Sequence, residues 1–500
     1  MSLWKRKKIQ KVLLSKVWIN FLLSICCLAL PFLNENFFFL IWFGFCPFFF
    51  YLDKNKRFPF LKGFFLGLIF FLVSIYWLKN VTYLGWILLS LYCAIYFGIF
   101  FYFFAKYKLN NIKDCLFYSS LWVILEFIRA NFLGGFSWNM LYNSQIKFLP
   151  LIQICSVLGA YSVSFLIIFS NLFLYLCFKK NKKYHILILF FLIGFIYIYG
   201  LFVLDKFKES DKHLKLGLIQ PNIPIEMKLD DSKKVLVYER IKTQLLKLKD
   251  KDLDLIILPE TAIPGIINED EIFLNDLKKI CKTERLNVLT GIFLKEARSY
   301  YNAAVLIDKK GSLAQIYKKI KLVPFGEYTP LKRFFPFLKK ITPFVDLVPG
   351  KDYSVFDLKD FRFICLICFE DTFPRFVKEF VKKNRNIDFL VEITNDAWFK
   401  SKVQLYQHLS SSVFRSIENR LPALRSANTG ISCLILPTGK VLKKLREFTQ
   451  GELIVNFPLI KKNSQINGSF LFIFFTFGSF LIILIQKTEK EVKRYGDFDR

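Results

Sequence analysis

Three reactive side chains stand out in the second half of the chain. Glu260 and Cys368 each close an apolar, strand-like run, and Lys319 lies between them in chain order, in the motif Tyr317-Lys-Lys319. A thiol, a carboxylate and an ammonium are the groups that acyl transfer through a thioester needs. We predict that Cys368 is the nucleophile, Glu260 the general base, and Lys319 the cation that stabilises the oxyanion.

Each of these residues also has an ordinary explanation when it is taken alone. Cys368 could be a core cysteine of a strand, Glu260 a turn carboxylate, and Lys319 one lysine among many. Histidine is the usual partner of a catalytic thiol, and only His408 lies inside the same half of the chain. A carboxylate base is therefore the better prediction, because burial can raise the pKa of a carboxyl group into the working range.

Cys365 and Cys368 form a Cys-x-x-Cys pair, which could indicate a metal or redox site. In an extended strand, however, positions three apart point to opposite faces. No second Cys or His pair with ligand spacing accompanies them. We predict neither a metal nor a cofactor.

The composition indicates a membrane protein. Of 500 residues, 54% are hydrophobic and 18% aromatic, with 61 Phe, which no ordinary soluble domain resembles. The net charge of +31 comes from Lys spread along the chain, without a basic helix interleaved with aromatic residues. We expect contact with anionic phospholipid head groups and no nucleic acid.

Apolar runs long enough to cross a bilayer recur before residue 205 and once near the C-terminus. The first follows Lys5-Arg-Lys-Lys8 without a small-residue cleavage site, so we interpret it as an uncleaved helix. The sequence thus predicts a polytopic α-helical membrane domain of about eight spans. The runs are 17–34, 37–52, 58–78, 83–105, 115–133, 150–178, 185–204 and 469–486.

The connections between these runs alternate in charge. The N-terminus and the connections near 54–57, 106–113 and 179–183 are rich in Lys and Arg, and those between them are poor in both. The positive-inside rule makes the basic connections cytoplasmic. Both termini are then predicted in the cytoplasm, and residues 205–468 outside it.

Between residues 214 and 460 the pattern changes to that of a soluble α/β domain. Near-continuous apolar runs, typical of strands covered on both faces, are separated in places by helical patterns at 232–249 and 268–285. The Phe-, Pro- and Lys-rich stretch 331–350 is predicted to be a surface loop that touches lipid. The predicted strands are 214–219, 253–258, 287–293, 303–307, 363–368, 389–393 and 430–436.

The short sequence motifs around the three reactive residues resemble those of a known family. Glu260 in Leu-Pro-Glu-Thr, Lys319 and Cys368 match the Glu–Lys–Cys triad of the nitrilase superfamily. The segment 319–330 is similar to a signature of the apolipoprotein N-acyltransferases. So is Thr394-Asn-Asp-Ala-Trp-Phe399 with the residues that follow it, namely His408, Arg415, Arg420, Pro422, Arg425, Asn428 and Gly430.

The resemblance covers nearly the whole chain and implies an architecture. Residues 1–205 would be a membrane domain of about seven helices. Residues 206–466 would be an extracytoplasmic, nitrilase-like αββα sandwich, and residues 467–500 a final span with a cytoplasmic tail. The protein would lie in the bacterial inner membrane, with its catalytic domain on the periplasmic side.

The resemblance also implies an activity. An acyl chain from a phospholipid, typically phosphatidylethanolamine, would pass through a thioester on Cys368. Its acceptor would be the α-amine of the S-diacylglyceryl cysteine that begins an apolipoprotein. A monomer would suffice, without a cofactor.

Further residues take roles from the same resemblance. Glu327 would brace Lys319 or join the proton transfers, and Phe369 and Glu370 would form the pair beside the nucleophile. The backbone N–H that follows Cys368 would complete the oxyanion site. Possible substrate-binding residues are Trp138, Asn395, Trp398 and His408.

Two other classes of protein remain open. A membrane-anchored C–N hydrolase, an amidase, would use the same Glu–Lys–Cys triad with water as the acceptor. A transporter with an accessory domain would need ionisable residues inside its spans. The main ones here are Glu126 and Arg129, which we expect to pair with each other near the membrane interface.

Overall fold

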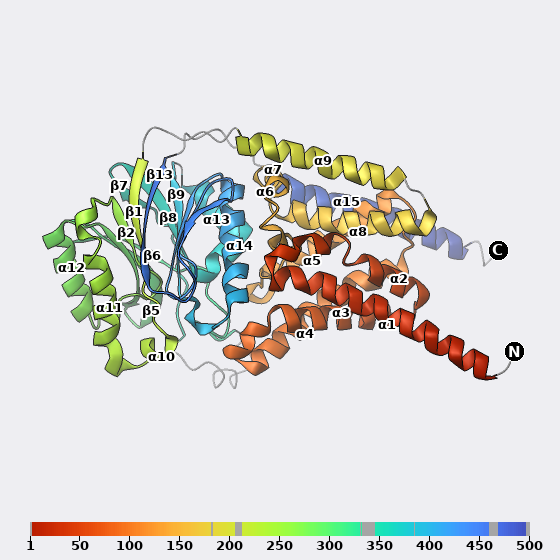
Figure 1. Cartoon of the computed structure of the whole chain (residues 1–500), viewed down its shortest axis with the longest axis horizontal. Helices are drawn as coiled ribbons and strands as arrows, with labels where there is room; N and C mark the ends of the chain where they lie inside the picture. Colours follow the sequence, from red (N-terminus) through yellow and green to blue (C-terminus); the bar gives the residue numbers. More distant parts are fainter. Residues whose placement is uncertain are drawn as a thin grey trace. The chain divides into compact units, whose positions relative to one another are not determined.

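The computed structural model describes residues 3–181, 184–205, 213–330, 332, 346–384, 386–459 and 469–496. Its internal contacts divide the chain into two units. One unit is Met1–Asp205 together with Ile466–Arg500, and the other is Lys206–Gln465. The first is helical and the second is built on two β-sheets (Figure 1).

The helical unit contains long helices joined by short connections. Its longer elements are α1 (Leu3–Leu33), α3 (Pro59–Ser74), α4 (Tyr83–Lys106), α5 (Ile112–Asn131), α8 (Tyr161–Lys180), α9 (Tyr184–Asp205) and α15 (Ser469–Gly496). Shorter ones are the 3-10 helix η1 (Glu35–Trp42), α2 (Cys46–Lys54), α6 (Leu149–Ile152) and α7 (Cys155–Leu158).

Among the described residues, five helices are long and apolar enough to cross a membrane, or six if the bent pair of η1 and α2 counts as one span. Each predicted apolar run falls on a helix. The run 150–178 is divided among α6, α7 and α8, and Gly159, with a positive φ of 79°, separates α7 from α8. The five spans lie at Tyr83–Lys106, Ile112–Gly134, Tyr161–Lys180, Ile186–Asp205 and Leu471–Glu489.

Close helix contact depends on glycine and phenylalanine. Gly63 and Gly67, one turn apart on α3, face the Phe97 and Phe101 side chains of α4, and a Cβ at either glycine would come within 2.7 Å of those rings. Small residues at this spacing let helix backbones approach closely in membranes. The phenylalanines therefore have a packing role in addition to their contribution to overall hydropathy.

The expected pairing of Glu126 with Arg129 is not what the structure has. The Arg129 guanidinium donates to the carbonyl oxygens of Trp138 (2.9 Å) and Asn139 (3.2 Å), and Glu126 accepts from the N–H of Leu141 at 2.8 Å. Both side chains satisfy the backbone of one turn. Unpaired backbone groups are costly in an apolar unit. Hydrogen bonds from these side chains to the backbone are therefore favoured over an ion pair between Glu126 and Arg129.

The first sheet of the second unit has the strand order β13-β1-β2-β4-β5-β6, with β3 also paired to β4. Strands β1, β2 and β4 are parallel, and β13, β5 and β6 are antiparallel to their neighbours. The bounds are β1 His213–Gln220, β2 Leu255–Ile257, β3 Ile266–Ile267, β4 Val288–Glu296, β5 Ser299–Ile307, β6 Leu313–Lys318 and β13 Gly451–Pro458.

The second sheet has the order β12-β11-β10-β9-β8-β7. Its centre, β8, β9 and β10, is parallel, and all three strands are almost entirely buried. The bounds are β7 Phe356–Leu358, β8 Phe361–Ile367, β9 Phe389–Thr394, β10 Ala423–Ala427, β11 Cys433–Ile435 and β12 Val441–Lys444.

Helices cover the outer faces of the two sheets (Figure 1). α11 (Lys234–Leu246) and α12 (Ile272–Glu284) cover the first sheet, and α13 (Pro374–Lys383) and α14 (Lys402–Asn419) cover the second. In α12 the buried residues Leu274, Leu277 and Cys281 follow helical spacing, which explains why this segment packs as an amphipathic helix. The arrangement is an αββα sandwich.

The predicted fold class is confirmed, with an apolar helical part and an α/β sandwich. Each predicted strand and helix of the sandwich overlaps an observed one. Strands β3, β6, β7, β10, β12 and β13 and helices α13 and α14 were not predicted. Most of these strands are short or mix polar and apolar residues, whereas α13 buries Phe376, Val377 and Phe380 at helical spacing, a pattern that the prediction missed. Most of the predicted lipid-touching loop, 331–350, lies outside the described residues.

Aromatic stacking across three strands holds the second sheet. The Phe363 ring lies 5.2 Å from Phe356 and 5.0 Å from Phe389, nearly parallel to both, and is fully buried. We expect Phe363→Ala to destabilise the protein by about 3–5 kcal/mol and to lower Tm in detergent by roughly 10 °C.

Leu236→Ala on α11, where the side chain is 58% exposed, is the matched control and should change stability by less than about 0.5 kcal/mol. Equal losses for both variants would contradict this account of the sheet.

Candidate active site

Glu260 lies just beyond the carboxyl end of β2 and is 6% exposed. One carboxylate oxygen accepts from the Asn302 amide at 2.8 Å and from Lys319 Nζ at 3.3 Å, and the other accepts from the backbone N–H of Asn395 at 2.9 Å. These donors hold the carboxylate in one orientation. Gly291 on β4 permits the position, since a Cβ there would come within 2.4 Å of the Thr261 nitrogen.

Lys319 follows β6 directly and is 1% exposed. Its ammonium donates to Glu327 Oε1 at 2.9 Å as well as to Glu260. Burial alone would lower the pKa of Lys319, but the carboxylates of Glu327 and Glu260 outweigh burial and raise it. The lysine is therefore a permanent cation at neutral pH. Lys318 differs, because it pairs with Glu296 on a partly exposed face at 2.5 Å.

Glu327 and Asn302 complete this polar group. Glu327 Oε2 accepts from the N–H of Val323 at 2.8 Å, which closes a turn, while its Oε1 accepts from Lys319 and from the Asn302 amide at 2.9 Å. Asn302 thus donates to both carboxylates. This contact is the one that bracing of Lys319 by Glu327 would need, and bracing and a part in the proton transfers both stay predictions.

Cys368 occupies the turn after β8, with a left-handed φ of 53°. A non-glycine residue in this region carries backbone strain, which in proteins is often found where a side chain is held for function. Cys368 keeps some exposed surface, whereas Cys365 is completely buried within β8. Of the two cysteines, only Cys368 is placed to meet a substrate.

Cys368 lies among protein groups that disfavour its thiolate. Burial raises the pKa of the Cys368 thiol well above its ordinary value, the charge of Glu260 adds to this effect, and Lys319 opposes it. The resting thiol is therefore protonated. Attack on a carbonyl by this thiol would require a base to remove its proton. Glu260 is the carboxylate whose charge has the largest effect on the pKa of the thiol.

Glu370 connects the turn that Cys368 begins to the loop after Lys319. Its Oε1 accepts from the Tyr317 hydroxyl at 2.7 Å and from the N–H groups of Ile320 (2.7 Å) and Lys321 (3.0 Å), and its Oε2 accepts from Ile367 N–H at 2.8 Å. Burial raises the pKa of Glu370 to about 7, although these donors oppose the shift.

Phe369, its neighbour, is 6% exposed and packs edge-to-face on Phe373. Phe369 and Glu370 therefore support the turn by packing and by hydrogen bonds respectively.

The four residues predicted as possible substrate contacts lie in different places. Trp138 is buried in the helical unit, with its ring 5.4 Å from that of Trp77. Asn395 donates its N–H to Glu260, and Trp398 is partly exposed in the same turn. His408 is fully buried on α14, which does not fit direct contact with substrate.

Two residues at the site escaped the sequence analysis. Asn302 carries no motif, and only its place on β5 between β4 and β6 brings it to Glu260. Lys228, at the end of α10 (Ile225–Lys228), donates to the Glu260 carbonyl at 3.2 Å and to the Thr261 hydroxyl at 3.0 Å. Burial lowers the pKa of Lys228 to about 8. The preceding Asn222-Ile-Pro224 turn was its one sequence signal.

The fold and this site define the class of protein, a carbon–nitrogen hydrolase domain joined to an apolar helical unit. The family model for carbon–nitrogen hydrolases matches residues 215–461. The model for the apolipoprotein N-acyltransferase N-terminal domain matches residues 24–173.

Curated relatives match most of the chain. The apolipoprotein N-acyltransferase of Geobacter metallireducens is 32% identical over 84% of this chain and 85% of its own length. That of Aquifex aeolicus is 31% identical over 86% and 95%. Among solved structures, a nitrilase-superfamily amidase from Nesterenkonia covers 50% of this chain at 17% identity, with a TM-score of 0.39.

The chain therefore belongs to the apolipoprotein N-acyltransferase family. It is an acyltransferase and a bacterial membrane protein, and the predicted resemblance is confirmed.

The raised pKa of Cys368 has a measurable consequence. Only the thiolate reacts with iodoacetamide, so the alkylation rate of Cys368 should still increase with pH above pH 9, without a plateau. The measurement is peptide mass spectrometry of the alkylated enzyme at a series of pH values.

Lys319→Met is the companion variant, because loss of the cation should slow alkylation further at every pH. A plateau below pH 8 would instead indicate a stable thiolate in the resting enzyme.

Proposed function

We propose that this chain transfers a fatty acyl group from a phospholipid to the α-amine of the S-diacylglyceryl cysteine of an apolipoprotein. One observation carries the proposal beyond family membership: the partly exposed thiol of Cys368 lies on a strained turn and senses the charges of both Glu260 and Lys319. A nucleophile, a base and a fixed cation in one site are what a thioester route requires.

In the first half-reaction, Cys368 Sγ attacks the ester carbonyl of the donor while Glu260 takes the thiol proton. The carbonyl oxygen becomes an oxyanion, which Lys319 and the backbone N–H of Phe369 stabilise. The C–O bond to the glycerol oxygen then breaks, and Glu260 returns its proton to that oxygen. The products are a thioester on Cys368 and a lysophospholipid.

In the second half-reaction, the acceptor amine attacks the thioester and Glu260 removes a proton from its nitrogen. The oxyanion forms again at the same place. The C–S bond breaks, the thiol regains the proton, and an amide is released. The same base therefore serves both steps, which is consistent with a ping-pong scheme.

The supporting residues fix the positions of the base, Glu260, and the cation, Lys319, relative to each other. Glu327 and Asn302 hold Lys319 and Glu260 through hydrogen bonds of 2.8–2.9 Å. We assign Glu370 and Phe369 to the turn that carries the nucleophile. Asn395 orients Glu260, and Trp398 and Trp138 are left as candidate contacts for lipid.

The location follows from the charge of the connections. We propose that residues 206–466 form a periplasmic catalytic domain, that residues 1–205 and 467–500 form the membrane domain, and that both termini are cytoplasmic. Phosphatidylethanolamine is the proposed donor, and a monomer contains all the residues of the proposed site. The alternation of Lys- and Arg-rich connections supports this orientation.

The thioester provides the direct test. Incubating the detergent-solubilised enzyme with phosphatidylethanolamine alone should add the mass of one acyl chain to Cys368, and hydroxylamine should remove it. Cys368→Ala should show no added mass and no turnover, with nearly unchanged stability, since a thiol and a methyl group differ little in size. Cys365→Ala is the matched control and should remain largely active.

Adding a diacylglyceryl-cysteine peptide to the acyl-enzyme should transfer the chain to the peptide amine. Rapid release of free fatty acid, with no gain from the peptide, would favour a membrane-anchored hydrolase instead.

Reporter fusions test the orientation. A reporter active only outside the cytoplasm should be active when inserted at residue 300 and silent when fused at residue 500. The opposite pattern would refute the proposed topology, because the basic connections would then lie outside the cytoplasm.

A further inference from the structure

Beneath the nucleophile turn lies a buried cluster of charged side chains. It contains His408 from α14, Asp371 from the turn that Cys368 begins, Glu392 from β9, Asp396 from the turn after β9, and Arg425 from β10. All are 2% exposed or less. We call this set the charge cluster.

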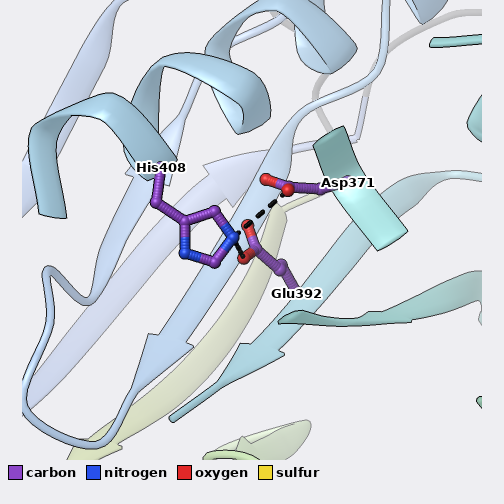
Figure 2. A group of neighbouring side chains, drawn as sticks. All are labelled: Asp371, Glu392 and His408. Carbon is purple, nitrogen blue, oxygen red and sulfur yellow. Dashed lines mark ion pairs between the residues drawn. The ribbon is translucent and has the colours of Figure 1, made fainter. Parts of the chain in front are cut away.

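His408 is the centre of the charge cluster. Its Nδ1 lies 2.8 Å from Asp396 Oδ1, and its Nε2 lies 3.3 Å from both Asp371 Oδ1 and Glu392 Oε1. Figure 2 shows the ring edge of His408 turned toward the carboxylates of Asp371 and Glu392. Nε2 is also 3.4 Å from the carbonyl oxygen of Cys368.

A histidine and two carboxylates within reach of one point resemble a metal site. The Arg425 guanidinium occupies this place, however. It donates to Glu392 Oε1 and, at 2.9 Å, to Asp396 Oδ2, and it lies 3.8 Å from Asp371 Oδ2. A divalent ion would meet a fixed positive charge beside it and would compete for carboxylates that are already paired.

The cations of the cluster are paired with its acidic groups. Burial and Arg425 oppose a charge on His408, but Asp396, Asp371 and Glu392 outweigh them and raise the pKa of His408 to about 10. Burial raises the pKa of Glu392 to about 8, while the charges of Arg425 and His408 oppose this shift. Ser412 bonds both Asp371 (2.8 Å) and Glu392, which fixes their separation.

The charge cluster reaches both halves of the proposed chemistry. Asp371 lies three residues after Cys368 in the same turn. Asp396 follows Asn395, whose N–H binds the Glu260 carboxylate. His408 contacts both turns, since Nδ1 binds Asp396 and Nε2 faces Asp371 and the Cys368 carbonyl oxygen. The two turns therefore cannot shift relative to each other without breaking a buried ion pair.

We propose that His408 and Arg425 are positioning residues. They connect the Cys368 turn to the Asn395 turn and so fix the distance between the Cys368 thiol and its base, Glu260. This inference rests on the proposed role of Cys368 and deepens it. Because the cluster is wholly buried, it touches no substrate, and its loss should change the rate of chemistry without changing lipid binding. A misplacement of about 1 Å can reduce the rate on the order of 10²-fold.

The test compares three variants of the full-length enzyme in detergent. His408→Gln keeps hydrogen-bonding capacity but removes the charge. Ser412→Ala is milder and removes only the bridge between Asp371 and Glu392. Leu409→Ala, one residue from His408 on α14 and 3% exposed, is the matched control, since it destabilises the same helix outside the cluster. Measured quantities are kcat and KM for phosphatidylethanolamine, the rate of acyl-enzyme formation, and Tm.

We expect His408→Gln to reduce kcat and the rate of acyl-enzyme formation on the order of 10²-fold, with KM nearly unchanged. Ser412→Ala should lose about 10-fold in kcat, as expected for one hydrogen bond to a charged group. Leu409→Ala should lower Tm and leave kcat nearly unchanged at temperatures below its transition.

Three results would overturn the inference. The first is that His408→Gln and Ser412→Ala have the same kcat as Leu409→Ala when all three variants have lost the same amount of Tm. Another is a raised KM with an unchanged kcat, which would mean direct substrate contact. The third is one equivalent of bound metal in the purified active enzyme. If the wild-type enzyme itself adds no acyl mass at Cys368, the proposed function fails instead.

Discussion

The structure of the site depends on one buried ion pair, that between Lys319 and the carboxylates of Glu260 and Glu327. Neither charge could remain in this interior alone, and removing one partner of such a pair typically costs about 3–5 kcal/mol. Asn302 and the Asn395 N–H supply the remaining hydrogen bonds. The two carboxylates raise the pKa of Lys319 and thus keep the lysine protonated before any substrate arrives.

This preorganisation explains why the thiol does not need to be a stable thiolate. With Lys319 committed to two carboxylates, its charge only partly offsets burial at Cys368, and the thiol stays protonated. In the proposed mechanism, proton transfer to Glu260 accompanies attack, when the oxyanion forms and Lys319 can stabilise it.

The sandwich brings Glu260, Lys319 and Cys368 together because the strands that precede them end near one another. Glu260 follows β2, Lys319 follows β6, and Cys368 follows β8 of the other sheet, so the site lies where turns from both sheets meet. A turn is less rigid than a strand, and each one here is held by a buried carboxylate. Glu370 secures the Cys368 turn from one side, and the charge cluster secures it from below.

The sequence by itself determined the apolar runs and seven of the strands, because hydrophobic runs are local, and its short motifs supplied the proposed triad of Glu260, Lys319 and Cys368. It did not predict Asn302, Lys228 or the burial of His408. Those depend on which strands become neighbours: β5 lies between β4 and β6, and α14 packs over β10. Only the tertiary structure decided which charges pair, since a charge finds its partner through space, across residues far apart in the chain.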